Sequence, residues 1–513
     1  MSLFRSAFTV SGFTLGSRIL GYIRDVMIAA FAGAGVLSDA FFVAFRLPNF
    51  FRQISAEGAF NAAFVPIFSG KISVEGKEDA LNFAQKSMAW MCLFLVILVI
   101  IVEIFMPTAM LLLAPGFIDN PEQFDLAVLL GRIMFPYLLF ISMVALCSGM
   151  LQSFGKFAVA AAVPMLLSGS MIVGLWLFAD KAQTPVHVLA YAVLVAGVLQ
   201  WLVMLYAIKK AGFSFSLALP KWDDEIKVLL KRMGPGIVGG GVMQLNVWVN
   251  TVIATTLVPG AVSYLYYADR LAQFPLALIG TAIGTALLPT LSVQFKQAKL
   301  EQAITTQNRA MEMGILFALP AAIALAVLAE PIISLLFERG AFTASDSAAS
   351  AAALTAYALG VPAFILVKIF IPSFFAAGDT KTPVLIALAC LVFNVTLNLI
   401  LMQFIGHVGL ALSTAISSWL NVSLLIFILK KHKRYHIDRE ALKRLSLIFC
   451  SSLVMGVVLY ILHHYLKDFA AKGSFYLLLE VVALSTVGAI TYFLVTHFSG
   501  GFTLGELKAR FHR

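Results

Sequence analysis

Ionisable side chains occur inside three long apolar stretches of this chain, near residues 8–31, 38–69 and 262–293. On insertion scales, an arginine at the centre of a bilayer costs about 2.5 to 3.5 kcal/mol, so five lipid-facing arginines would together cost more than ~10 kcal/mol. We therefore expect these side chains to face water, one another or a ligand. The set comprises Arg18, Arg24, Asp25, Asp39, Arg46, Arg52, Glu57, Asp269 and Arg270.

The composition of this set indicates the chemistry of its ligand. Its arginines outnumber its acids, and a guanidinium group remains charged in a low-dielectric setting and binds phosphate oxygens in pairs. The pattern predicts a cationic site for a phosphate or pyrophosphate group. An alternative is that the arginines anchor helices through internal ion pairs or extend to the membrane surface. Neither the acids nor the histidines have metal-ligand spacing, so we expect no metal site, no catalytic residue and no enzyme.

The elements that position these residues are predicted to be transmembrane helices. Of the 513 residues, 61% are hydrophobic and 12% are charged, whereas soluble domains are about half apolar and a quarter charged. Fourteen apolar stretches are found, most of them long enough to cross a hydrocarbon core of ~30 Å as a helix, and they lack the alternation of barrel strands. The predicted fold is an all-α integral membrane protein. Besides the three above, its stretches lie near residues 88–113, 124–151, 157–178, 188–208, 234–257, 313–337, 351–375, 383–402, 409–429, 445–462 and 475–495.

The connections between these stretches alternate in charge. One set is rich in lysine and arginine, as in residues 430–444, whereas the other offers only Lys181, Arg339, Lys467 and Lys472. By the positive-inside rule, both termini of this multi-pass membrane protein are predicted to be cytoplasmic. The net charge of +10 then reflects orientation and attraction to anionic membrane lipids, and no nucleic-acid partner is expected.

Self-comparison at an offset of about 224 residues indicates an internal repeat, because residues 44–47 match residues 268–271 and Gly116 matches Gly340. Each repeat contains six helices, and because six is an even number, both repeats have the same orientation in the membrane. The sequence therefore predicts two parallel repeats around a central cavity. The predicted parts are an N-lobe of residues 1–217, a C-lobe of residues 218–437 that includes a cytoplasmic amphipathic segment at 220–232, and two additional helices in residues 438–513.

Four motifs resemble the signatures of the MurJ/MviN family of lipid II flippases, within the multidrug/oligosaccharidyl-lipid/polysaccharide exporter superfamily. They are SRILGYIRD at 17–25, SDAFFVAFRLPN at 38–49, EGAF at 57–60 and YYADRL at 266–271, and the resemblance covers the whole chain. It implies transport of lipid II to the periplasmic or outer leaflet by alternating access, for peptidoglycan synthesis. It also implies an inward-open cavity, a groove beside the last two helices for the undecaprenyl chain, and transport roles for positions matching Arg18, Arg24, Asp39, Arg52 and Arg270.

Two positions depart from the family pattern. Arg46 stands where lysine is expected, which preserves charge, and Gln273 stands where an acid is common, which puts an acidic switch there in doubt. Ser17, Asp25 and Gln273 are secondary site candidates. The expected partners are lipid II, membrane lipids and the cell-wall synthesis machinery. No cofactor is expected, and the membrane potential or a coupling cation would supply energy. The alternatives are a flippase for another polyprenyl-linked saccharide, a cation-coupled drug exporter and, less favoured, a membrane-embedded transferase.

Overall fold

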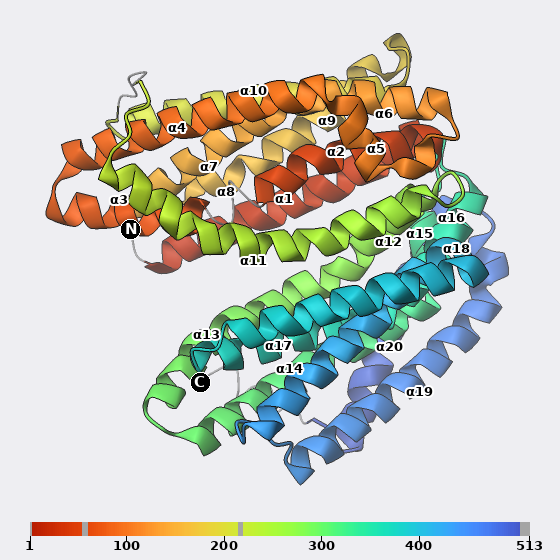
Figure 1. Ribbon diagram of the computed structural model, residues 1–513. Coiled ribbons are helices and arrows are strands. Elements are labelled where there is room, and N and C mark those ends of the chain that lie inside the picture. The colour runs from red at the N-terminus through yellow and green to blue at the C-terminus, as the bar shows by residue number, and fades with distance from the viewer. Residues whose placement is uncertain (1–2, 54–59, 214–218, 503–513) are drawn as a thin grey trace. The chain divides into compact units, whose positions relative to one another are not determined.

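The computed structural model describes residues 3–53, 60–213 and 219–502, and within these ranges every regular element is helical (Figure 1). In this part of the chain, ten helical segments are long and apolar enough to cross a membrane. The predicted all-helical membrane architecture is therefore confirmed. The exact number of crossings stays a prediction, because several helices that carry charged or polar residues are not among these ten.

The chain forms two compact units. Unit 1 comprises Met1–Ser263 and Arg339–Phe342, and unit 2 comprises Tyr264–Glu338 and Thr343–Arg513. The division falls after Ser263, whereas the lobe boundary predicted from the sequence falls after residue 217. The two C-terminal helices belong to unit 2 and form no unit of their own.

Unit 1 is built from helices that begin at strong local signals. Asn120 accepts a hydrogen bond from the backbone N–H of Gln123 and caps α6, and proline occupies the first turn of α6, α9 and α10, where no intrahelical donor is lost. Its helices are α1 (Leu3–Ala32), α2 (Val36–Phe51), α3 (Asn61–Val74), α4 (Lys77–Ile104), α5 (Met106–Leu113), α6 (Pro121–Met134), α7 (Tyr137–Ser153), α8 (Ala158–Ala162), α9 (Pro164–Phe178), α10 (Pro185–Lys210) and α11 (Asp224–Thr255), with the 3₁₀ turns η2 (Pro115–Phe117) and η3 (Ala179–Lys181).

Unit 2 begins within α12 (Ala261–Pro275), which continues through the π-helical segment η4 (Leu276–Gly280) into α13 (Thr281–Lys296). Thr343 starts α16 with a capping box, in which its side chain and that of Asp346 bond each other's backbone N–H groups. The remaining helices are α14 (Leu300–Val327), α15 (Ala329–Phe337), α16 (Ala344–Ala358), α17 (Val361–Ala376), α18 (Lys381–Lys431), α19 (Arg439–Ala470) and α20 (Ser474–Phe498).

Element α18 consists of two helices joined by a sharp bend. Ile405 and Gly406 have non-helical backbone angles, and the φ of 54° at Gly406 is one that glycine adopts readily. A Cβ atom on Gly409 would lie only 2.7 Å from the carbonyl carbon of Leu401, so the chain has folded back on itself there (Figure 1). The bend lies between the apolar stretches predicted at 383–402 and 409–429.

Two predicted segments take a different form in the structure. The apolar stretch at 38–69 is divided between α2, which contains Pro48, and α3, which starts at Asn61. The amphipathic segment at 220–232 is not a separate helix, because α11 starts at Asp224 and continues without a break to Thr255. Ile226 and Leu229 are buried there, whereas Trp222 is exposed and packs edge-on against Trp90.

Candidate functional site

Helix α1 carries an arginine and an aspartate that bond each other. Arg24 is 8% exposed, and its Nε and Nη2 atoms donate to Oδ1 of Asp25 over 3.0 and 2.7 Å. Asp25 therefore offsets the Arg24 charge inside the protein, where an unpaired charge would be costly. Arg18 lies almost two turns earlier and is exposed, and Ser17 beside it is half-buried.

Arg46 lies on helix α2, and Arg52 follows directly after its last residue. The Nη1 atom of Arg46 donates to the backbone oxygen of Val247 over 3.3 Å and also to the Thr251 hydroxyl, both on α11. Arg52, directly after α2, donates to Oδ1 of Asn49 over 3.2 Å. Arg46 thus connects two helices of unit 1, whereas Asn49, the partner of Arg52, lies only three residues earlier in the chain. The predicted site residue Glu57 lies outside the described residues.

Asp39 on α2 caps the start of α12. Its Oδ2 atom accepts from the Gly260 N–H over 2.7 Å, and its Oδ1 atom accepts from the Ser263 N–H and hydroxyl over 2.8 and 2.5 Å. The Ser38 hydroxyl also bonds the Ser263 hydroxyl over 3.0 Å. Asp39 is 2% exposed, and its carboxylate satisfies the first N–H groups of a helix whose N-terminus favours negative charge. In this structure, Asp39 therefore fixes the chain and does not face open space.

In unit 2, Asp269, Arg270 and Gln273 lie on one segment of α12. The Nη2 atom of Arg270 donates to the Tyr266 hydroxyl over 2.9 Å, and the guanidinium carbon lies 4.9 Å from the centre of the Tyr266 ring. The Gln273 amide donates to Oδ2 of Asp269 one turn away. The tyrosine orients the planar guanidinium group by stacking and by a hydrogen bond, an arrangement suited to binding a planar or tetrahedral anion.

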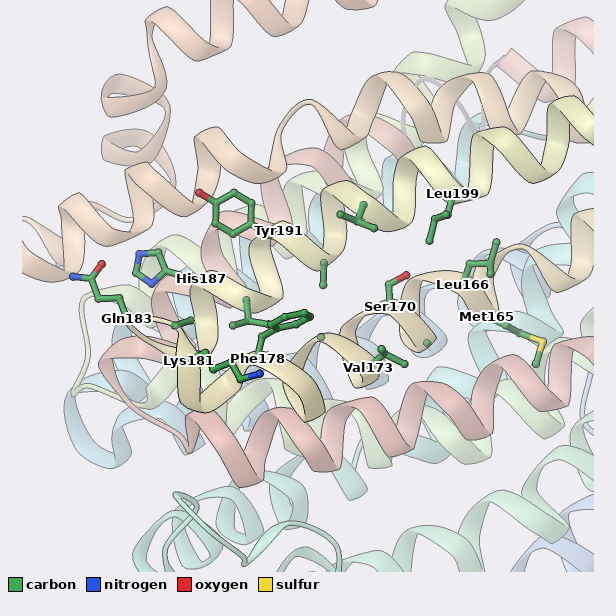
Figure 2. Close-up of a pocket in the computed structure, with 16 residues that line it drawn as sticks. Met165, Leu166, Ser170, Val173, Phe178, Lys181, Gln183, His187, Tyr191 and Leu199 are labelled. Atoms are coloured by element: carbon green, nitrogen blue, oxygen red, sulfur yellow. The ribbon is translucent and has the colours of Figure 1, made fainter.

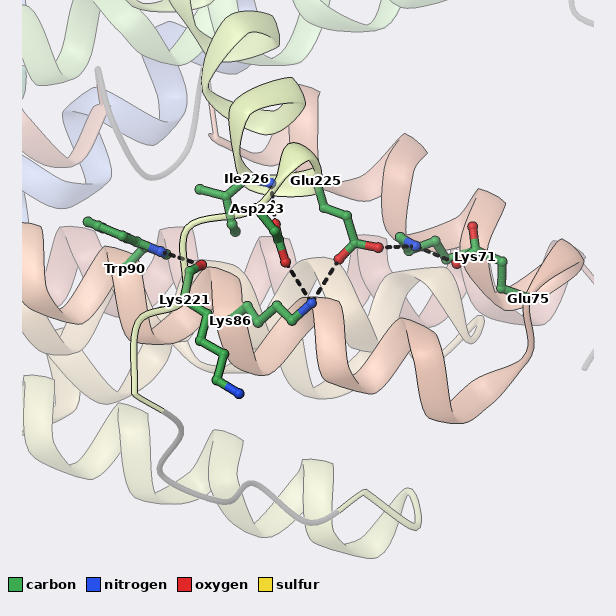
Figure 3. A network of polar contacts seen from close by, with 8 residues as sticks. All are labelled: Lys71, Glu75, Lys86, Trp90, Lys221, Asp223, Glu225 and Ile226. Atoms are coloured by element: carbon green, nitrogen blue, oxygen red, sulfur yellow. Dashed lines mark hydrogen bonds and ion pairs between the residues drawn. The ribbon is translucent and has the colours of Figure 1, made fainter.

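A polar network that the sequence did not single out joins α3, α4 and the start of α11 (Figure 3). Lys86 Nζ lies 2.7 Å from Asp223 and 3.3 Å from Glu225, and Lys71 Nζ lies 2.6 Å from Glu225. Partial burial alone would raise the pKa of Asp223, but bonds from Lys86 and from the Ile226 N–H lower it below its usual range. The signal available in the sequence was the acid cluster at 223–225, but nothing in the sequence placed it beside Lys71 and Lys86, which lie far earlier in the chain.

The described site residues are thus distributed over three helices with distinct environments. Unit 1 contains the arginines of α1 and α2, one of them paired with Asp25 and another bonded to α11. Unit 2 contains Arg270 with its tyrosine. A guanidinium group presents its donors in a fork geometry that can bind two oxygens of one phosphate group.

The architecture and these buried charges define a multi-pass membrane protein of the transporter class. A solved structure described as an inward-facing multidrug resistance MATE transporter of the MOP superfamily matches with a TM-score of 0.68 at 17% identity, covering 83% of this chain and 98% of that one, which shows a shared fold. A structure described as the lipid II flippase MurJ in an inward closed conformation matches with a TM-score of 0.80 at 27% identity, covering 95% and 98%.

Sequence comparison gives the family. The family model described as lipid II flippase MurJ matches residues 28–481. A probable lipid II flippase MurJ of Rickettsia prowazekii (strain Madrid E) is 38% identical over 497 residues, covering 96% of this chain and 97% of the relative. The lipid II flippase MurJ of Burkholderia cenocepacia is 38% identical over 439 residues, covering 85% of each. The chain belongs to the MurJ family of lipid II flippases, which are transporters and not enzymes.

Proposed function

We propose that this protein moves lipid II, the undecaprenyl-pyrophosphate-linked precursor of peptidoglycan, from the cytoplasmic to the periplasmic or outer leaflet by alternating access. The observation that carries the proposal is the set of arginines in membrane-spanning helices of a chain from this family: Arg18, Arg24, Arg46, Arg52 and Arg270. Such charges inside a membrane mark a substrate path, and guanidinium groups match the oxygens of a pyrophosphate.

Each unit has one arginine that is best suited to contact a pyrophosphate, Arg18 in unit 1 and Arg270 in unit 2. Tyr266 holds the plane of Arg270, so less side-chain entropy is lost on binding. Arg18 is exposed on α1. Arg24, paired with Asp25, and Arg46, bonded to α11, supply positive potential around the ligand while they also stabilise unit 1. Asp39 has an indirect role, because its carboxylate caps the N-terminus of α12.

The proposal also includes fourteen membrane crossings. Twelve of them form two related sets of six, and α19 and α20 are the last two. The ten apolar segments become fourteen crossings when α18 counts as two and when α1, α2 with α3, and α11 are added. Asp39 and Ser263 bond each other although they are 224 positions apart, the offset of the repeat, and equivalent positions that touch are typical of a two-fold axis.

Two glycines related by the same offset support these repeats. A Cβ atom on Gly116 would lie 2.0 Å from the carbonyl oxygen of Thr255, at the end of α11. A Cβ atom on Gly340 would lie 2.2 Å from the carbonyl oxygen of Ala30, near the end of α1. The same offset places the equivalent of Ala30 at Ala254, the residue next to Thr255. Each glycine therefore allows the same close approach to the first helix of a repeat.

The proposal includes cytoplasmic termini, location in the inner membrane and use of the membrane potential or a coupling cation to reset a cationic site. It also gives α19 and α20 the role of receiving the undecaprenyl chain. Their outer faces carry exposed large apolar side chains, among them Val457, Tyr460 and Val482. Proteins of the cell-wall synthesis machinery would receive the flipped product.

The deciding experiment depletes the protein in its host and adds to spheroplasts an external enzyme that cleaves only outward-facing lipid II. Loss of cleavage together with accumulation of intact lipid II would support the proposal. Restoration by the wild-type chain, but not by Arg270→Ala at equal abundance, would connect the activity to the arginine set. Unchanged cleavage with accumulation of another polyprenyl-linked saccharide would overturn the assignment of lipid II as substrate.

A further inference from the structure

An apolar cavity of about 840 Å³ lies between α9 and α10 of unit 1 (Figure 2). Small residues on α9 create it. At Gly174, a Cβ atom would lie 3.3 Å from side-chain atoms of Val188 and Ala192 on α10, whereas at Gly169 it would meet nothing within 4 Å. The helices therefore touch near Gly174 and leave unfilled space beside Gly169 and Ser170.

The cavity has polar side chains at one end only. Figure 2 shows Lys181, Gln183 and His187 gathered at this end, and Met165, Leu166 and Leu199 at the opposite end. His187 is oriented by a 2.7 Å hydrogen bond between its Nδ1 atom and the Thr184 hydroxyl. Lys181 belongs to a connection that the charge pattern assigns to the outer side of the membrane, where bases are scarce.

The length of the cavity corresponds to one leaflet. At 1.5 Å per residue, α9 rises ~20 Å between Met165 and Phe178, and α10 rises ~18 Å between His187 and Leu199. Half of a hydrocarbon core of ~30 Å is ~15 Å. An acyl chain that starts at the polar end would therefore fill the groove and end near the middle of the bilayer.

We propose that this groove is a binding site for an anionic glycerophospholipid of the outer leaflet. One acyl chain lies along α9 and α10, and the lipid phosphate is held by Lys181 with Gln183 and His187 beside it. The cationic, hydrogen-bonding end of the cavity matches the phosphate of such a lipid, and the apolar part of the cavity matches its acyl chain. An undecaprenyl chain is much longer than one leaflet, so the groove does not match it.

A transmembrane helix from another protein would also be attracted by small residues, which allow backbones to approach closely. Here, however, the exposed rings of Phe178 and Tyr191 line the same cavity, at 52% and 57% exposure. These rings stand beside the small residues and hold a second helix backbone away from them. A flexible acyl chain fits between the rings, so the lipid is the occupant that the cavity favours.

The test measures lipid binding to the purified full-length chain by native mass spectrometry, with phosphatidylglycerol and phosphatidylethanolamine as probes. Lys181→Gln is expected to weaken phosphatidylglycerol binding about five-fold, or about 1 kcal/mol, and to weaken phosphatidylethanolamine binding less, because the ammonium group of that lipid already offsets the charge of its phosphate. Lys472→Gln is the matched control, because Lys472 lies 5.6 Å from the Phe469 ring just as Lys181 lies 5.7 Å from the Phe178 ring. It belongs to the same predicted membrane side, outside this cavity.

A second pair of variants tests the apolar part. Gly169→Leu places a side chain in the open space and is expected to reduce binding of both phospholipids, whereas Gly70→Leu, at another helical glycine with open surroundings, is expected to leave it unchanged. Equal phosphatidylglycerol binding by wild type, Lys181→Gln and Gly169→Leu would overturn the proposal. So would preferential binding of undecaprenyl phosphate at this groove, or a protein that co-purifies stoichiometrically and is lost with Gly169→Leu.

Discussion

Arg46 and Arg270 occupy equivalent positions of the repeated sequence, yet their surroundings differ. Arg46 reaches from α2 to Val247 and Thr251 on another helix, α11. Arg270 donates to Tyr266 one turn earlier on its own helix and lies against the ring. Two equivalent arginines therefore have different structural partners. Arg46 bonds two helices together, whereas Arg270 is oriented by a tyrosine of its own helix, as the proposed contact with a ligand requires.

Arg270→Ala should give the largest effect on transport. It removes charge-assisted hydrogen bonds worth about 1.5 to 3 kcal/mol each, so we expect outward exposure of lipid II to fall by on the order of 100-fold at normal protein abundance. The cleavage assay on spheroplasts, with immunoblotting, measures both quantities. Arg309→Ala, at an exposed arginine on α14, is the control. Loss of the protein itself would show that Arg270 is an anchor like Arg46.

Asp39→Asn should give the largest effect on stability. Loss of the negative charge from the α12 cap is expected to lower the free energy of unfolding by about 1 to 2 kcal/mol, seen as a lower melting temperature in detergent. Ser263→Ala removes one of the three bonds and should lower it less. An unchanged melting temperature with abolished transport would instead indicate direct contact between Asp39 and the substrate.

Arg46→Ala should lower the melting temperature more than Arg270→Ala, because it separates α2 from α11. Thr251→Val removes one acceptor of Arg46 and should cost about 1 kcal/mol. The double variant is expected to be less destabilised than the sum of the two single variants, since both act on one contact. Strict additivity would mean that the bond between Arg46 and Thr251 contributes little.

Tyr266→Phe should give the smallest effect. The ring that stacks on Arg270 remains and only the hydroxyl acceptor is lost, at about 1 kcal/mol, so transport should fall about five-fold. The same cleavage assay, compared with Tyr206→Phe at an exposed tyrosine on α10, measures it. Transport as low as in Arg270→Ala would show that the hydroxyl touches the substrate itself.

The sequence predicted the helical elements well because apolar length decides where a chain crosses a membrane. Each of the fourteen stretches overlaps a helix, and the bend at Ile405 and Gly406 lies in the predicted gap. The side-chain partners were less predictable. The offset related Asp39 to Ser263, but a repeat alone does not reveal that equivalent residues touch. Likewise, the amphipathic segment predicted at 220–232 did not reveal that Lys86, distant in sequence, would bond Asp223.

The bend within α18 also affects how the chain enters the membrane during synthesis. Ile405 and Gly406 connect two apolar helices with so little intervening chain that neither can be delivered to lipid without the other. Lys381 starts the first helix, and Lys430 and Lys431 end the second, so both outer ends of the hairpin carry positive charge. By the positive-inside rule we expect these ends to stay on the ribosome's side of the membrane. We therefore expect the hairpin to integrate as a unit, with Gly406 leading.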